Sequence, residues 1–128
     1  MITKEISFVM NGSDINIEVD IRKSLLDVLR EEGLTSIKQG CGVGECGACT
    51  ALIDDVPTDT CMYLAVWADG KDIRTAEGES RDGNLSKVQR AYIDAGAVQC
   101  GYCTPGFIMT TTAFVEKYKG KEVDRELI

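Results

Sequence analysis

The residues of this sequence that could do chemistry are its six cysteines, and the sequence contains no histidine. Four cysteines lie between residues 41 and 61, and two form a C-x2-C pair at residues 100–103. Without imidazole there is no histidine ligand, general base or proton shuttle, so a bound metal would be held by thiolate or carboxylate. The sequence also lacks a nucleophile motif and a phosphate-binding glycine loop. The cysteines are therefore the candidate functional residues.

The first group begins in the segment KQGCGVGECGACT, residues 38–50. Cys41, Cys46, Cys49 and Cys61 have the spacing C-x4-C-x2-C-x11-C, which is the spacing of plant-type [2Fe–2S] sites. Four thiolates around an iron–sulfide core form a buried anion, so the loop must bring backbone N–H groups close to the sulfurs. The glycines of this segment allow that approach. Structural zinc usually takes two separate C-x-x-C pairs, so zinc is a weaker alternative here, as are disulfides.

The second group is the pair Cys100 and Cys103 in the segment VQCGYCTPG, residues 98–106. It could be a redox-active dithiol, half of a zinc site or half of an iron–sulfur site. A thioredoxin-like dithiol normally follows a strand, whereas the preceding residues have a helical pattern, and no basic residue lies nearby to lower a thiol pKa. Two thiols cannot complete a tetrahedral site, so a metal or cluster here would need two more ligands.

The composition excludes several classes of partner. The formal net charge is −7, which disfavours nucleic acid and anionic membranes as binding partners. The N-terminal twenty residues alternate between polar and apolar types, unlike a signal peptide, and no apolar run approaches the length of a membrane span. We therefore expect a cytoplasmic protein, in which six cysteines are more typical of metal binding or redox chemistry than of a disulfide framework.

The N-terminal part of the sequence predicts strands that pack on one helix. Residues 3–10 and 14–21 alternate as strands do, with an Asn11-Gly12 turn between them. A helix is expected from an N-cap at Ser24 to Gly33. Two further short strands are expected at residues 50–53 and 72–75. A hairpin, a helix and then more strands is the order of an α+β fold.

After residue 77 the pattern becomes helical. Residues 78–84 are polar and rich in turn formers, so we expect a linker there. Two helices should follow, one with its N-cap at Ser86 and one with its N-cap at Thr104 followed by Pro105. Their expected inner faces are formed by Val88, Ala91, Tyr92 and Ala95, and by Ile108, Thr111, Thr112, Val115 and Tyr118. A third helix should begin at Asp124. We therefore expect two domains, residues 1–77 and residues 78–128.

Three blocks of the sequence resemble one known family. KQGCGVGECGACT, CMYLAVWADGKDIRTAEG and AVQCGYCTPGFIMTTTA are similar to segments of the iron–sulfur subunit of the molybdenum hydroxylases, which include the xanthine dehydrogenases and aldehyde oxidases. The blocks occur in family order and cover nearly the whole chain. The residues around Cys61 are most similar to the small subunit of bacterial xanthine dehydrogenases.

The resemblance implies a ferredoxin-like β-grasp domain followed by a small all-α bundle, with a [2Fe–2S] cluster in each. It assigns Cys41, Cys46, Cys49 and Cys61 to the first cluster as ligands. It assigns Cys100 and Cys103 to the second cluster as two of its four ligands. Gln99 matches a residue that contacts the pterin of the molybdenum cofactor; the alternative is that it caps a buried backbone group.

The resemblance also implies a function and partners. The chain would be the non-catalytic electron-transfer subunit of an oxidoreductase, with a molybdopterin-binding large subunit and an FAD-binding subunit as partners. Members of the family continue past the position of Ile128 with a helix and a C-x-C motif, so we expect the helical domain and the second site to be incomplete in this chain. The main alternative is a free-standing ferredoxin-like carrier with one [2Fe–2S] cluster, and a third possibility is a zinc-stabilised interaction domain.

Overall fold

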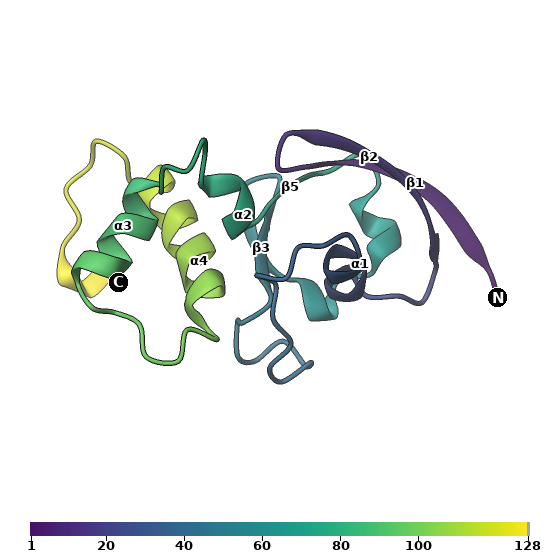
Figure 1. Cartoon of the computed structure of the whole chain (residues 1–128), viewed down its shortest axis with the longest axis horizontal. Helices are drawn as coiled ribbons and strands as arrows, with labels where there is room; N and C mark the ends of the chain where they lie inside the picture. Colours follow the sequence, from purple (N-terminus) through teal and green to yellow (C-terminus); the bar gives the residue numbers. More distant parts are fainter. Residues whose placement is uncertain (128) are drawn as a thin grey trace.

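The computed structural model describes residues 1–127 and has two parts that lie side by side (Figure 1). One part is a five-stranded sheet that packs on helix α1 (Leu25–Glu31). The other contains helices α3 (Lys87–Asp94) and α4 (Thr104–Lys117). This is the α+β arrangement that the order of elements predicts.

The N-terminal hairpin follows the predicted pattern closely. Strand β1 spans Thr3–Met10, as expected. Strand β2 spans Ser13–Asp20, so it begins and ends one residue earlier than expected. Asn11 and Gly12 have φ values of 50° and 86°, which is the backbone of a two-residue hairpin turn that matches strand twist. Ile15, Ile17 and Val19 lie on the more buried face of β2, and the residues between them are more exposed.

The sheet has the strand order β2-β1-β5-β3-β4. Strand β3 spans Thr50–Ile53, β4 spans Val56–Asp59 and β5 spans Asp72–Arg74. Strand β5 runs parallel to β1 and antiparallel to β3, so residues distant in the sequence meet at the centre of the sheet. Strand β4 was not predicted. It is made possible by a tight turn at Asp54 and Asp55, which have φ values of 48° and 66°.

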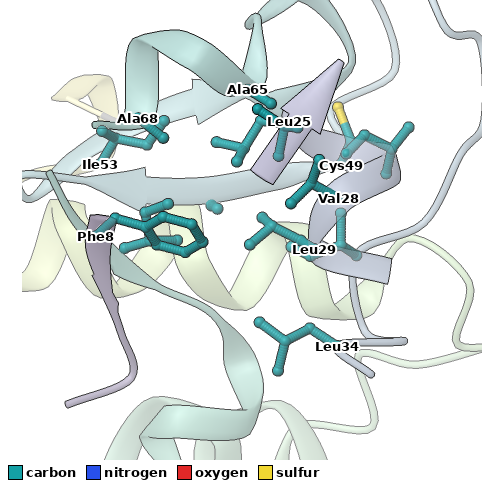
Figure 2. Packing of buried hydrophobic residues seen from close by; sticks show 14 of the residues in the cluster. Phe8, Leu25, Val28, Leu29, Leu34, Cys49, Ile53, Ala65 and Ala68 are labelled. Carbon is teal, nitrogen blue, oxygen red and sulfur yellow. The ribbon is translucent and has the colours of Figure 1, made fainter. Parts of the chain in front are cut away.

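Helix α1 packs on the sheet and supplies four leucine and valine side chains to the main core. Its N-cap is the predicted Ser24, whose hydroxyl accepts a hydrogen bond of 3.1 Å from the Asp27 N–H. Leu25, Val28 and Leu29 are fully buried against Phe8 and Ile53 from the sheet (Figure 2). The 3₁₀ turns Thr60–Met62 and Ala65–Ala68 close the remaining side of this core.

The connection between the two parts is more ordered than a linker. A short helix, α2 (Ala76–Glu79), occupies part of the segment expected to be a linker, and Arg81 and Asn84 form a β-bridge after it. The Asn11 side chain accepts a hydrogen bond from the Thr75 N–H at 2.8 Å and donates one to the Thr75 hydroxyl at 2.8 Å. The hairpin turn thereby fixes the point at which the chain leaves the sheet.

The helical part confirms the predicted elements and most of their inner faces, since the predicted inner residues Ile108 and Thr112 are buried and Val88, Tyr92, Thr111 and Tyr118 are half-buried. Helix α3 begins at the capping box of Ser86 and Gln89. Helix α4 begins one residue earlier than expected, because Cys103 rather than Thr104 occupies the N-cap position. The predicted inner residues Ala91, Ala95 and Val115 are exposed, whereas Met109 is fully buried. The buried residues of α4 lie between Gly106 and Thr112, where the helix packs on β3, whereas Glu116 near its end contacts Arg74 of β5.

A second, smaller core joins the two parts. Leu52 of β3 points away from the main core and packs against Ile108 and Met109 of α4. All four residues of β3 are buried, because the strand is covered on both faces. Residues Arg125–Leu127 form a 3₁₀ turn where a third helix was expected to begin, and Ile128 lies outside the described residues. Among residues 1–127, no helix is long and apolar enough to cross a membrane.

Candidate metal centres

The first cysteine group lies in a glycine-rich loop between α1 and β3. Arg30 of α1 anchors the start of the loop, because its guanidinium donates hydrogen bonds to the carbonyl oxygens of Thr35 at 3.2 Å and Ile37 at 2.6 Å. The Lys38 N–H donates to the Ala48 carbonyl oxygen at 3.2 Å and closes the loop at its base. These hydrogen bonds hold the start and the base of the loop in place against the core.

Backbone N–H groups inside the loop point at its sulfurs. Cys41 Sγ accepts from the N–H groups of Val43 at 3.4 Å, Glu45 at 3.2 Å and Cys46 at 3.3 Å. Cys46 Sγ accepts from the N–H groups of Cys41 at 3.4 Å and Ala48 at 3.5 Å. Such contacts favour sulfur that carries negative charge, as a cluster ligand does.

The loop can take this path only because of its glycines. A β-carbon at Gly40 would lie 2.6 Å from Cys46 Sγ, so a side chain there would displace the sulfur. Gly42, Gly44 and Gly47 have positive φ values, between 69° and 77°, a region that glycine enters without steric cost. The predicted role of these glycines in bringing the backbone to the sulfurs is therefore confirmed.

The third and fourth cysteines lie deeper in the molecule. Cys49 is buried in the main core beside Val28 (Figure 2), and Cys61 is half-buried. The Thr60 hydroxyl donates to the Cys49 carbonyl oxygen at 2.7 Å, and the Cys61 N–H donates to Cys49 Sγ at 3.5 Å. The structure thus brings Cys61, twelve residues farther along the chain than Cys49, to the base of the loop.

The thiols of this group differ in how easily they ionise. Hydrogen bonds from the Val43, Cys46 and Glu45 N–H groups lower the pKa of Cys41 to about 7. Burial, together with a hydrogen bond to Cys49, raises the pKa of Cys61 to about 11. A bound metal cation would overcome the second effect, because coordination deprotonates a thiol.

These features fit an iron–sulfur centre. A [2Fe–2S] centre takes four thiolates, the number that this group of cysteines offers. The loop glycines and the N–H groups aimed at sulfur are what an anionic cluster would need.

The second cysteine pair lies at the surface, between α3 and α4. Cys100 and Cys103 are exposed and line a hollow of about 390 Å³, together with Gln99. Gly101 between them has a φ of 86°, so the backbone reverses there and both cysteines face the same hollow. The two thiols could hold one side of a cluster whose other ligands lie elsewhere.

The second site touches the first loop, a contact that sequence reasoning missed. Tyr102 lies between the two cysteines of the pair, and its hydroxyl donates a hydrogen bond of 2.5 Å to the Gln39 carbonyl oxygen. A β-carbon at Gly106 would overlap the Gly47 carbonyl oxygen and lie 3.3 Å from the backbone of Ala48. The sequence does not predict these contacts, because neither a tyrosine inside a C-x2-C motif nor a glycine in a helix is specific for packing against a distant loop.

Both parts of the chain match known families of iron–sulfur domains. Residues 8–84 match the family of 2Fe-2S iron-sulfur cluster binding domains, and residues 75–127 match a [2Fe-2S] binding domain. The two matches together cover both cysteine groups. They favour iron–sulfur clusters over the zinc and dithiol alternatives.

Individual relatives agree with these matches. The chain is 54% identical to the iron-sulfur-binding subunit of xanthine dehydrogenase from Escherichia coli O157:H7, over 93% of this chain and 75% of that protein. It is 50% identical to the small FeS subunit of nicotinate dehydrogenase from Eubacterium barkeri, over 88% of this chain and 72% of that protein. Among solved structures, quinoline 2-oxidoreductase from Pseudomonas putida 86 superposes with a TM-score of 0.85 at 36% identity, covering 96% of this chain and 84% of that one.

Proposed function

This chain belongs to the family of iron–sulfur subunits of the molybdenum hydroxylases, and we propose that it passes single electrons from a molybdopterin centre to a flavin. Electron transfer within such a complex is the function common to the relatives. The observation that carries the proposal is that one chain holds two separate cysteine sites, in contact with each other. A free-standing carrier with one cluster would have no use for the second site.

In this proposal Cys41, Cys46, Cys49 and Cys61 hold the first cluster. When bound, a [2Fe–2S] cluster supplies one-electron redox chemistry, at potentials on the order of −400 mV in plant-type ferredoxins. The residues of this chain do the rest: the backbone N–H groups that point at Cys41 and Cys46 stabilise negative charge on sulfur. The burial of Cys49 keeps the inner side of the site dry.

The exposed site is the one proposed to face the molybdenum partner. Cys100 and Cys103 would supply two ligands to a second cluster, and Gln99, which lines the same hollow, would contact the pterin. A side-chain amide can both donate to and accept from a pterin ring, which suits this role. Gln99 is exposed, whereas the competing role, capping a buried backbone group, would hold its side chain inside the protein.

The proposed partners are a molybdopterin-binding subunit and an FAD-binding subunit. Xanthine or another purine is the substrate class we propose, because the xanthine dehydrogenase subunit is among the most similar relatives. We also propose a cytoplasmic location, in keeping with cysteines that serve as ligands rather than as disulfides.

Iron and acid-labile sulfide analysis, combined with an absorption spectrum, tests the proposal. One [2Fe–2S] cluster gives about two irons per chain and two clusters give about four. Zinc without visible absorption would contradict the proposal. Co-purification with a molybdopterin-containing subunit separates an enzyme subunit from a free carrier, because a free carrier would purify alone.

A further inference from the structure

The carboxylate of Asp59 lies beside the first cysteine loop. A β-carbon at Gly44 would lie 3.7 Å from Asp59 Oδ2 and 3.0 Å from Met62 Cγ, so both side chains pack against this part of the loop. The Gly44 backbone also hydrogen-bonds to the thiol of Cys61. The Asp59 carboxylate is therefore next to backbone that contacts a cysteine of the first site.

The backbone of Asp59 is fixed on both sides. As the last residue of β4, Asp59 pairs with Thr50 of β3, which directly follows Cys49. The next residue, Thr60, is fully buried, and it donates to the Cys49 carbonyl oxygen from its N–H at 3.4 Å and from its hydroxyl at 2.7 Å. The fold thereby sets the position of the carboxylate relative to the loop.

The negative charge of this carboxylate is not used within the strand or the turn that follows it. Asp59 is half-buried. It occupies the N-cap position of the 3₁₀ turn Thr60–Met62, but its side chain makes no capping hydrogen bond. Among residues 1–127, no lysine or arginine lies within ion-pair distance of it. Its charge therefore acts directly on the neighbouring loop.

We propose that Asp59 lowers the reduction potential of the first site, so that the site passes its electron on rather than retaining it. This inference rests on the proposed function. Reduction adds one electron and one negative charge at the site, and no atom or proton is transferred. The partner's molybdenum centre is the reductant and the partner's flavin is the oxidant. A fixed carboxylate nearby opposes the added negative charge and favours the oxidised form.

The expected size of the effect follows from the distance. A unit charge about 10 Å from the site, at an effective dielectric constant of about 20, changes a one-electron equilibrium by about tenfold. A tenfold change corresponds to about 59 mV for a one-electron couple. Asp59→Asn removes the charge with little change in the shape of the side chain, so it isolates this contribution.

The measurement is made on the full chain loaded with iron and sulfide at the first site. Each protein is equilibrated at neutral pH with a redox dye of known potential, and the ratio of reduced to oxidised cluster is read from electron paramagnetic resonance and visible absorption. This ratio should rise about tenfold in Asp59→Asn and in Asp59→Ala, because both variants lose the charge. Asp59→Glu keeps the charge and should match the wild type.

Asp14→Asn is the matched control. Asp14 is exposed on β2, which lies at the opposite edge of the sheet from β4. The substitution changes the net charge of the chain by the same amount as Asp59→Asn. It should leave the ratio of reduced to oxidised cluster unchanged.

The possible failures are distinguishable. An unchanged ratio in Asp59→Asn and Asp59→Ala, at wild-type iron and sulfide content, would overturn the inference. A changed ratio in only one of these two variants would also overturn it, because the loss of charge is common to both. Loss of the cluster from both variants would show that Asp59 is needed for assembly rather than for the potential. Absence of a cluster from the wild-type chain would contradict the proposed function itself, and with it this inference.

Discussion

Arg74 should be the residue that holds the sheet and the helices together most strongly. Its guanidinium contacts Glu79 of α2 at 2.6 Å, Glu116 of α4 at 2.8 Å and 3.0 Å, and Asp55 of the β3–β4 turn at 3.1 Å. One side chain on β5 thereby reaches three other elements. We expect Arg74→Met to destabilise the fold and to loosen the helices from the sheet.

The magnitude depends on how exposed each partner is. Asp55 is 70% exposed and contributes little. The two-point contact with the half-exposed Glu116 should contribute about 1 kcal/mol. Glu79 is 12% exposed, so leaving it without its cation should cost about 1–3 kcal/mol. We therefore expect the free energy of unfolding to fall by about 2–4 kcal/mol, with a decrease in Tm of about 10 °C for a chain of this size.

Urea unfolding, followed by circular dichroism and by Trp67 fluorescence, measures the loss. Arg22→Met is the matched control, because Arg22 contacts Asp20 in the same two-point manner, at 2.8 Å and 3.1 Å, but is 77% exposed and joins no second element. We expect no measurable change for Arg22→Met. If Arg74→Met unfolds at the same urea concentration as Arg22→Met, the argument that Arg74 joins the two parts is wrong.

Three further predictions concern acid stability, the contact between the sites and the ligand sets. Burial alone would raise the pKa of Glu77, but hydrogen bonds from Ser36 and Thr75 lower it below 4.5. The stability that this carboxylate adds is therefore present at neutral pH and is lost as the pH falls below about 4.5. Glu77→Gln should remove this contribution, so that stability measured by urea unfolding falls less steeply in acid than it does for the wild type. Gly106→Ala gains about 1 kcal/mol of helix propensity but forces an overlap that costs about 1–3 kcal/mol, so it should lower Tm. Thr110→Ala, on the exposed face of the same helix, should not lower it, and equal Tm values for these two variants would contradict the close approach. Cys49→Ser should abolish the visible absorption of the first cluster, whereas Cys103→Ser should leave it intact, as iron and sulfide content will reveal.

The sequence predicts those parts of the fold whose signals are local. The alternation in residues 3–20 and the turn at Asn11-Gly12 locate the hairpin within one residue, and Ser24 and Ser86 locate two helix starts. Strand β4 escaped prediction because Pro57 lies within its four residues and its turn uses two aspartates, which is an uncommon choice. The buried face of α4 could be predicted in part: its period places Ile108 and Thr112 inward, but the burial of Met109 and the exposure of Val115 depend on where the helix crosses β3.

The same distinction applies to the sites. The spacing of the first cysteine group suffices to predict a cluster site, because three of its cysteines and the glycines around them lie in one continuous segment. The contact of Tyr102 with Gln39 joins residues 63 positions apart, and no local pattern encodes it. Arg74 likewise has four carboxylate contacts only because three elements converge on β5.

The order of the strands decides which backbone groups of the sheet are left unpaired. The outermost strands are β2 and β4, whose free backbone groups could pair with another copy and start aggregation. Strand β2 carries exposed Asp14 and Glu18, whose charge opposes such pairing. Strand β4 is four residues long, contains Pro57 and is partly covered by α4. Both margins of the sheet are therefore protected, so the sheet itself offers little opportunity for edge-to-edge aggregation.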